Sequence, residues 1–334
     1  MSIRRLWTLF PAGLLLASIG LHFVTMVLYT RMPNSFAAFT TFPIWVWGSV
    51  GLLASCTAFL FFRTRFSMLV TCIWTFTIFF MADEAKALGR FSAPTIEKGP
   101  AGTHHESPVL RVITLNCALR TDPYEAVKDY HPDVIFLQEV PHAYILKRLI
   151  DQLYQGQGDY RYDRRRSCGI IVRGKIKSSL LVPQYRSQLV TVETNSGRHL
   201  ELLNVHLQQA ATNLRLWKRS CWHQHSNNRR QRFVELHYAL ETLKQKTAFP
   251  RLPAIVAGDF NASANDPVYE LLRPEFTDAF STVGTGWGNT YHRSLPLLRI
   301  DRIYSSGKLI PLRSRAIKLP HSDHRMVVAD YIFR

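Results

Sequence analysis

The chain has 334 residues, enough for one large domain or two small ones, of which 47% are hydrophobic and 19% charged. Its formal net charge of +17 favours polyanionic partners such as nucleic acid, anionic lipid headgroups or phosphorylated small molecules; a general solubility charge is the alternative. The five cysteines show no C-x-x-C pair and no zinc spacing, which counts against a zinc cluster and a disulfide framework. One pair among Cys117, Cys168 and Cys221 stays open.

Three apolar stretches follow one another at the N-terminus, over about residues 6–29, 43–62 and 66–82. Each has, or nearly has, the roughly 20 residues needed to cross a hydrocarbon core of ~30 Å. Trp7, Trp45 and Trp47 lie near their ends, where interfacial aromatic residues are found. We therefore predict a bundle of about three transmembrane helices in residues 1–82. A cleaved signal peptide is the alternative, but the first apolar core is too long for one and lacks a small-residue cleavage site.

Charges in the short loops predict the orientation of these helices. Arg4 and Arg5 precede the first stretch, Arg63 and Arg65 lie between the second and third, and the other loop holds only Arg31. The positive-inside rule then places the N-terminus in the cytoplasm and everything after a third span outside it. If the third stretch does not cross, the rest of the chain lies on the cytoplasmic side.

Residues 83–108 contain several prolines and glycines without periodicity, which predicts a linker before a domain over residues 109–334. In that domain short apolar runs alternate with helical stretches. The predicted strands cover residues 109–115, 133–137, 170–172, 200–205, 255–259 and 299–304, with a final one after His324, and the predicted helices cover 124–130 and 228–245.

Polar residues recur where the predicted strands end. They are Asn116, Glu139, His206, Asp259, Asn261, Asp301, Asp323 and His324. Each alone fits a capped turn, a packed histidine or a surface ion pair, but together they predict one site. Asp259 and Asn261 stand two apart in A-G-D-F-N, so in an extended strand both point to the same face. An acid and an amide there suit a metal-bound water and a phosphoryl oxygen.

The chain resembles the endonuclease/exonuclease/phosphatase superfamily, which includes deoxyribonuclease I, exonuclease III-type enzymes, neutral sphingomyelinases and inositol polyphosphate 5-phosphatases. The resemblance rests on V-I-T-L-N, D-V-I-F-L-Q-E, L-N-V-H-L, A-G-D-F-N, R-I-D-R-I and H-S-D-H-R, which occur in that order. The stretches G-W-G-N-T-Y and P-L-L-R-I-D are similar to a membrane-anchored bacterial branch. The resemblance implies a four-layer α/β sandwich, two mixed sheets flanked by helices, after the transmembrane bundle.

The resemblance also implies roles for the strand-end residues. Mg²⁺, with Mn²⁺ as a substitute, is expected on Glu139, with Asn116 beside it and Asp323 assisting. His324 paired with Asp301 is expected as the acid–base or oxyanion unit. The remaining expected catalytic residues are Asp259, which orients or deprotonates water, and Asn261 and His206, which bind phosphoryl oxygens. Whether Asp259 or His324 is the base stays open.

Two stretches that mix basic and aromatic residues, 160–166 and 214–232, are candidates for substrate binding. Such a mixture suits a nucleic-acid backbone, an anionic bilayer surface, or simply a solvated basic loop and helix. The residues assigned to substrate binding are Arg164, Arg165, Trp222, Arg230 and Thr290. Pro141 stands where many nucleases of the family carry an arginine, which weakens the nuclease interpretation.

The resulting hypothesis is a Mg²⁺-dependent phosphoesterase of a bacterial inner membrane, with its domain on the non-cytoplasmic side. A deoxyribonuclease I-like nuclease is the first expectation for its substrate. A sphingomyelinase-like phospholipid phosphodiesterase and an inositol or sugar phosphatase are alternatives, and a non-catalytic binding domain is the alternative of another class. The expected partners are the bilayer and a phosphate ester, either nucleic acid or anionic lipid, and no obligate protein partner is evident.

Overall fold

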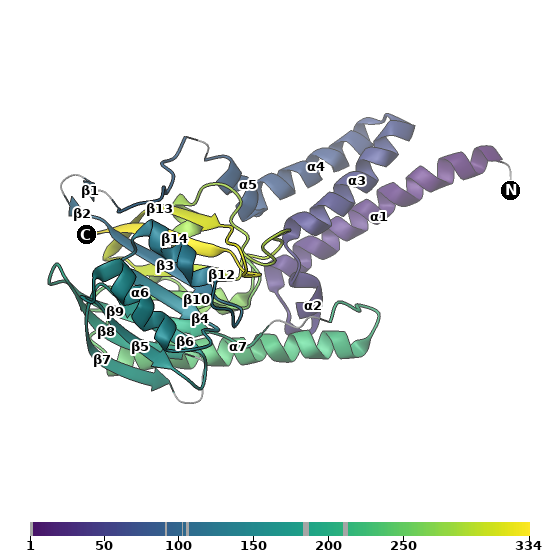
Figure 1. The fold of residues 1–334 in the computed structure, drawn as a ribbon. Helices are drawn as coiled ribbons and strands as arrows, with labels where there is room; N and C mark the ends of the chain where they lie inside the picture. The colour runs from purple at the N-terminus through teal and green to yellow at the C-terminus, as the bar shows by residue number, and fades with distance from the viewer. Residues whose placement is uncertain (1–2, 91, 102, 105–106, 183–186, 210–212) are drawn as a thin grey trace.

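The computed structural model describes residues 3–90, 92–101, 103–104, 107–182, 187–209 and 213–334. Three apolar helices project together from one side of an α/β domain (Figure 1). They are α1 (Ile3–Arg31), α3 (Ile44–Phe62) and α4 (Arg65–Met81). α1 and α3 are long and apolar enough to cross a membrane, and α4 is a shorter apolar helix. Large apolar side chains such as Leu16, Phe23 and Leu53 are exposed on their outer surface.

The three helices run antiparallel, so their ends fall into two groups. The N-terminus and the α3–α4 turn lie at the end away from the domain, whereas the end of α1, the start of α3 and the end of α4 adjoin it (Figure 1). Within the bundle, Trp74 is fully buried and donates to Ser18 Oγ over 2.9 Å. A Cβ on Gly51 would lie 2.1 Å from the Trp74 ring, so only glycine permits this approach.

Residues predicted as the start of a linker form α5 (Asp83–Leu88), which packs against both the helices and the domain. Glu84 Oε1 accepts hydrogen bonds from Trp45 Nε1 at 3.0 Å and from Asn289 Nδ2 at 2.9 Å. Asp83 forms an ion pair with Arg299 at 2.7 Å. Arg90 donates to three backbone carbonyls at the end of α8 (Ala279–Val283) and just after it. The helical bundle is therefore fastened to the domain by buried polar contacts.

The domain contains two six-stranded mixed sheets. The first has the order β13 (Leu309–Ile317), β14 (Met326–Phe333), β3 (Leu110–Asn116), β4 (Val134–Gln138), β6 (Cys168–Val172), β5 (Asp159–Asp163). The second has the order β11 (Phe276–Asp278), β12 (Asp301–Ser306), β10 (Ala254–Asp259), β9 (His199–His206), β8 (Ser187–Thr194), β7 (Gly174–Val182). β3 and β4 are parallel, as are β9 and β10, and the other pairs are antiparallel. A small hairpin joins β1 (Thr103–His104) to β2 (Ser107–Pro108).

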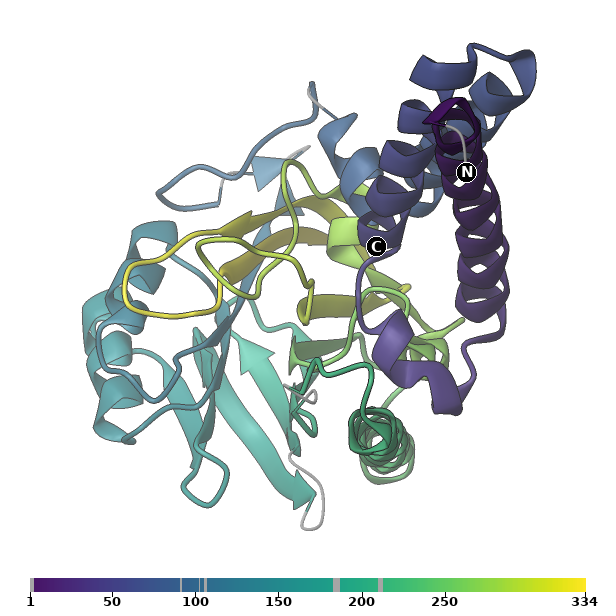
Figure 2. The same cartoon turned by 90° about the vertical axis from the view of Figure 1, so that its right-hand side faces the viewer.

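Four layers result, because the sheets pack face to face and helices cover their outer faces (Figures 1 and 2). Val112 and Phe136 of the first sheet meet Leu202 and Ile255 of the second in a fully buried core. The outer layers are η2 (Pro123–Tyr130) and α6 (Tyr144–Tyr154) on the first sheet, and α7 (Arg219–Lys246) and η3 (Pro267–Leu272) on the second. The predicted four-layer α/β sandwich is confirmed.

Several predicted elements have different bounds or types. The helix predicted over 124–130 is a 3₁₀ helix, and the one predicted over 228–245 begins earlier, at Arg219. The strand predicted over 299–304 begins at Asp301, and Arg299, which pairs with Asp83, precedes it. A short helix, α2 (Ala37–Thr40), follows η1 (Asn34–Phe36) between α1 and α3, where no element was predicted.

The buried ion pairs where the helical bundle meets the domain predict how stability depends on pH. Asp278 is buried against Arg299 at 2.6 Å and Arg302 at 3.0 Å. Burial alone would raise the pKa of Asp278 and of Asp83, but the Arg299 and Arg302 guanidinium groups outweigh it and lower both pKa values. A folded pKa below the unfolded one gives stability that is present above the ordinary value of about 4 and is lost as pH falls through the folded pKa.

We therefore expect the melting temperature of the purified full chain in detergent to fall steeply below about pH 4. Asp278→Asn should lower that temperature at pH 7, since breaking one buried charge pair costs about 3–5 kcal/mol, and should flatten the acid dependence. A variant whose melting curve runs parallel to that of the wild type from pH 7 to pH 3 would contradict this account.

Candidate active site

The polar strand-end residues converge at one edge of the two sheets. Parallel pairing of β3 with β4 and of β9 with β10 brings Asn116, Glu139, His206 and Asp259 to the same edge. β12 runs antiparallel to β10, and its first residue, Asp301, pairs directly with Asp259. Ligands of α/β sheets commonly bind outside the carboxyl ends of strands, so this is the expected place for a site.

Asp259 is positioned by the backbone on both sides of it. Gly258 has φ +142°, and a Cβ there would lie 1.9 Å from the carbonyl oxygen of Val205 on β9, so only glycine fits. Asp259 Oδ1 accepts the backbone N–H of Asn261 at 2.8 Å. Asn261 has φ 51°, so the strand alternation expected from the sequence ends at Asp259. Both side chains nevertheless line the same cavity.

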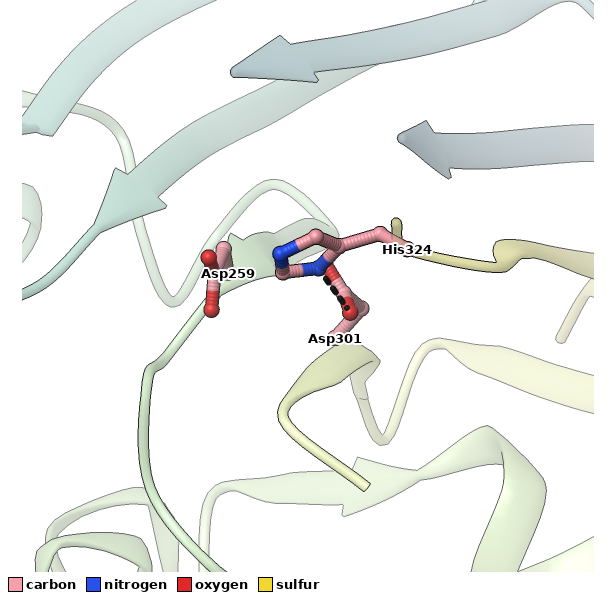
Figure 3. Close-up of side chains that lie close together, drawn as sticks. All are labelled: Asp259, Asp301 and His324. Carbon is pink, nitrogen blue, oxygen red and sulfur yellow. Dashed lines mark hydrogen bonds and ion pairs between the residues drawn. The ribbon is translucent and has the colours of Figure 1, made fainter. Parts of the chain in front are cut away.

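His324 lies between two carboxylates, those of Asp259 and Asp301 (Figure 3). Its Nδ1 is 2.8 Å from Asp301 Oδ2, so Nδ1–H donates to Asp301 and the other ring nitrogen is left for a ligand. Burial by itself would lower the pKa of His324, but the Asp301 carboxylate outweighs it and, with Asp259 and Asp323, raises that pKa to about 10. Burial, reinforced by Asp301, raises the pKa of Asp259 to about 7.

Glu139, Asn116 and His206 lie on the other side of Asp259. Asn116 Nδ2 donates to Glu139 Oε1 at 3.2 Å and to Asp259 Oδ2 at 3.1 Å. His206 Nε2 is 3.5 Å from Glu139 Oε1 and 4.0 Å from Asp259 Oδ2. Glu139 adopts φ 52°, an uncommon conformation for a residue other than glycine that is often found at functional sites. The two carboxylates are thus linked through one amide.

The predicted metal ligands differ in the atoms that they leave for a cation. Asn116 Oδ1 accepts the backbone N–H of Ala118 at 2.9 Å, so the amide offers nitrogen to the carboxylates and bridges them. This geometry departs from the expectation that Asn116 is a ligand. Glu139 and Asp323 both line the cavity, and Asp323 Oδ1 is buried without a hydrogen-bond donor in the described part of the chain.

Oxygen donors of this kind fit Mg²⁺, which takes one or two carboxylates and keeps most of its waters. Ligand atoms of Asp259, Asp301 and His324 also lie within 4.8 Å of one another. In that group, however, the hydrogen bond to Asp301 already occupies His324 Nδ1. The carboxylates of Glu139 and Asp323, which line the cavity beside the His324–Asp301 pair, are therefore of a chemistry that fits a divalent cation.

The site opens into a cavity of about 450 Å³, within the range of ordinary ligand pockets. Its polar lining residues are Glu139, His206, Asp259, Asn261, Asp323 and His324, together with Thr41, Gln209, Tyr291 and His292. Its apolar lining residues are Phe42, Pro43, Leu214, Leu295, Leu297, Leu298 and Ile300. Apart from Leu214, which begins the predicted 214–232 stretch, the apolar set and Tyr291 were not predicted as site residues, although Tyr291 stands in the quoted G-W-G-N-T-Y stretch.

None of the five residues predicted to bind substrate lines this cavity. Thr290 Oγ1 accepts the backbone N–H groups of Ile300 and Asp301, both at 3.2 Å, and so positions Asp301. Trp222 donates to the carbonyl of Leu216 at 2.7 Å and packs edge-on against Phe36. Arg230 lines a separate cavity near the end of α1. Arg164 and Arg165 lie in the turn between β5 and β6, whose Ser167 carbonyl accepts from Val140 N–H beside Glu139.

Comparison with known proteins agrees with this geometry. A family model described as "Endonuclease/Exonuclease/phosphatase family" matches residues 114–324. A Bacteroides thetaiotaomicron protein of that description has TM-score 0.54 and 17% identity, over 69% of this chain and 100% of its own. The mannosyl-6-phosphatase of the same organism has TM-score 0.53 and 16% identity, over 67% of this chain and 100% of its own. Humanized D. rerio TDP2 has TM-score 0.51 and 21% identity, over 67% of this chain and 98% of its own. A search of curated protein sequences found no match.

The His324–Asp301 pair gives a spectroscopic prediction. In the full chain without added divalent metal, Asp301→Asn should lower the pKa of His324 from about 10 toward the ordinary 6.5, because it removes the carboxylate that outweighs burial. Histidine ¹⁵N resonances followed against pH give this value, and the signal absent from His324→Gln identifies the residue. The exposed Asp151→Asn is the control and should leave that pKa in place. An unchanged pKa in Asp301→Asn would contradict the assigned pairing.

Proposed function

The chain belongs to the endonuclease/exonuclease/phosphatase family, whose members are metal-dependent phosphoesterases, and on this premise we propose that it is a membrane-anchored, Mg²⁺-dependent enzyme that hydrolyses phosphodiester bonds. The observation that carries the proposal is the meeting of Glu139, Asp259 and the His324–Asp301 pair at one cavity. These four buried or half-buried charged groups are supplied by separate strands of the two sheets. A contribution to the stability of the fold does not explain why they meet at one cavity.

Hydrolysis of a phosphodiester requires a positioned water, neutralised phosphoryl oxygens and a stabilised leaving oxygen. Asp259, whose pKa is raised to about 7, is suited to hold the water and to receive its proton. His324 holds a proton on each ring nitrogen and presents one of them to a phosphoryl or leaving oxygen, while Asp301 fixes the ring. His206 and Asn261 are the further proposed contacts to phosphoryl oxygens, and both line the cavity.

Glu139 and Asp323 are the proposed ligands of the cation, and Asn116 is the proposed bridge that holds Glu139 beside Asp259. When bound, Mg²⁺ supplies positive charge next to the phosphoryl oxygens. The backbone of Asn116 is held in place by Ser322. The Ser322 Oγ donates to the backbone carbonyl oxygen of Asn116 at 2.8 Å and accepts from the backbone N–H of His324 at 3.0 Å. The same serine thereby ties the proposed metal side of the site to the histidine side.

Membrane anchoring by α1, α3 and α4 is part of the proposal. It is supported by their length, by their apolar composition and by large apolar side chains that face outward from the bundle. Arg63 and Arg65 lie at the far end of the bundle, together with the arginine-bearing start of α1 (Figure 1). The positive-inside rule then favours an inner-membrane protein with its domain on the non-cytoplasmic side.

The sequence favoured nucleic acid as the substrate, in the manner of a deoxyribonuclease I-like nuclease. That preference rested on basic and aromatic residues, of which several have structural partners. Arg229 and Arg232 both pair with the buried Asp266 at 3.2 Å, and Trp222 packs against Phe36. Nucleic acid therefore remains a candidate substrate to be compared with lipid and small phosphate esters.

Glu139→Gln tests the proposed function. The full chain purified in detergent should hydrolyse bis(p-nitrophenyl) phosphate with Mg²⁺ and lose that activity with EDTA. Glu139→Gln should lower the rate by about 10²–10³-fold, because several kcal/mol of metal-dependent stabilisation is lost. The exposed Glu270→Gln is the matched control and should retain the wild-type rate. Hydrolysis that is insensitive both to EDTA and to Glu139→Gln would refute the proposal.

A further inference from the structure

One wall of the active-site cavity is supplied by the helical bundle. Thr41, Phe42 and Pro43 line the cavity beside Asp259 and His324. They lie between α2 and α3, immediately before Ile44, where one of the two helices able to cross a membrane begins. The cavity is therefore completed by the segment that leads into the bilayer-crossing part of the chain.

This wall is held in a fixed position. Thr41 Oγ1 and His225 Nδ1 of α7 are hydrogen bonded at 3.2 Å. The neighbouring Thr40 Oγ1 accepts from Arg229 Nη2 at 2.7 Å, and its carbonyl accepts from Ser263 Oγ at 3.1 Å. Figures 1 and 2 both place α2 against α7. The segment 41–43 is thus a built part of the cavity.

A second wall of the cavity is formed by a loop rich in leucine. Leu295, Leu297 and Leu298 line the cavity, and Leu295 and Leu297 remain 72% and 37% exposed. Exposed leucines contribute little to the core, so core packing does not explain their presence here. They give the cavity an apolar surface that leads outward from the site residues.

The leucine loop is attached to the membrane side of the molecule. Trp287 Nε1 donates to the carbonyl of Pro296 at 2.9 Å, and the Trp287 ring lies edge-on to Trp45, near the start of α3, at 5.9 Å between centroids. Asn289 donates to Glu84 at 2.9 Å and to the carbonyl of Leu297 at 3.2 Å. Both apolar walls therefore lie where α3 begins and α4 ends.

The charge of the cavity lining distinguishes a polynucleotide substrate from a lipid substrate. None of the described residues that line it is a lysine or arginine. Nucleic-acid binding depends on such residues along the phosphate backbone, so the lining does not suit a polynucleotide. A single phosphate group next to an apolar surface suits it better, because the cation and His324 meet the phosphate while the leucines meet hydrocarbon.

We propose that the substrate is a phosphodiester of a membrane lipid, which enters from the bilayer with its apolar part along Phe42, Leu295 and Leu297. This inference rests on the proposed function. In the reaction the oxygen of water bonds to phosphorus, and the bond from phosphorus to the lipid alcohol breaks. One water proton passes to the base and one proton passes to the departing lipid alcohol. Water is the only co-reactant, and the phosphorylated headgroup leaves the membrane.

The test compares three substrates of the full chain in detergent with Mg²⁺. They are vesicles of phosphatidylethanolamine and phosphatidylglycerol in equal parts, bis(p-nitrophenyl) phosphate, and a single-stranded oligonucleotide. We expect release of a water-soluble phosphorylated headgroup from the vesicles. In Leu295→Ser/Leu297→Ser the ratio of lipid to soluble-ester turnover should fall about tenfold or more, because apolar contact with the lipid is lost. The control Leu180→Ser, on the edge strand β7 and about as exposed as Leu297, should keep the wild-type ratio.

The other outcomes are decisive in different ways. Hydrolysis of the soluble ester without any lipid turnover overturns the lipid inference and leaves the proposed function standing. Cleavage of the oligonucleotide with a lipid-to-soluble ratio unaffected by the leucine changes also overturns it, in favour of a nuclease. Absence of Mg²⁺-dependent hydrolysis of all three substrates refutes the proposed function and the inference together. If the double variant does not fold, Phe42→Ser gives the same comparison at the other wall.

Discussion

Among the contacts that join the helical bundle to the domain are the ion pairs of one buried arginine, which lies close in sequence to the candidate site. Arg299 forms ion pairs with Asp83 at the end of the bundle and with Asp278 in the domain, at 2.7 and 2.6 Å. The side chains of Arg299 and Asp278 are almost fully buried and that of Asp83 is 27% exposed, so loss of Asp278 in particular leaves an uncompensated buried charge. Two residues later the same chain segment supplies Asp301 to the candidate site, so the contact with the bundle and the site share one stretch of backbone.

Convergence in the site follows from the pairing of strands. Parallel neighbours end at the same edge within each sheet, and the face-to-face packing of the two sheets then brings together residues separated by more than a hundred positions, such as Asn116 and Asp259 at 3.1 Å. Left-handed backbone at Glu139 and Asn261 turns both side chains at the point where their strands have ended. The surrounding hydrogen bonds hold these uncommon conformations in place.

The helical bundle also has a structural role in the cavity. Thr41, Phe42 and Pro43 form part of its lining, and Glu84 connects Trp45 of the bundle with Asn289 of the domain. Removing the bundle would therefore open the cavity and would take Glu84 from Asn289 and Asp83 from Arg299. For this reason the full chain, and not the isolated domain, is the appropriate subject for the measurements above.

The sequence by itself determined the apolar helices, the order of the central strands and the polar residues at their ends. These features are local, since they depend on runs of apolar residues and on the residue that follows each run. It did not predict edge strands such as β7, whose half-exposed residues lack a clear alternation, nor α5, which lies in a stretch with proline and glycine after it. Only the tertiary structure decided that Asn116 turns its amide nitrogen to the carboxylates, that Trp222 and Thr290 support other residues, and that Phe42 and Leu295 line the same cavity. Such contacts join distant parts of the chain, and their geometry is set by the packing of the sheets and the bundle, which no local pattern records.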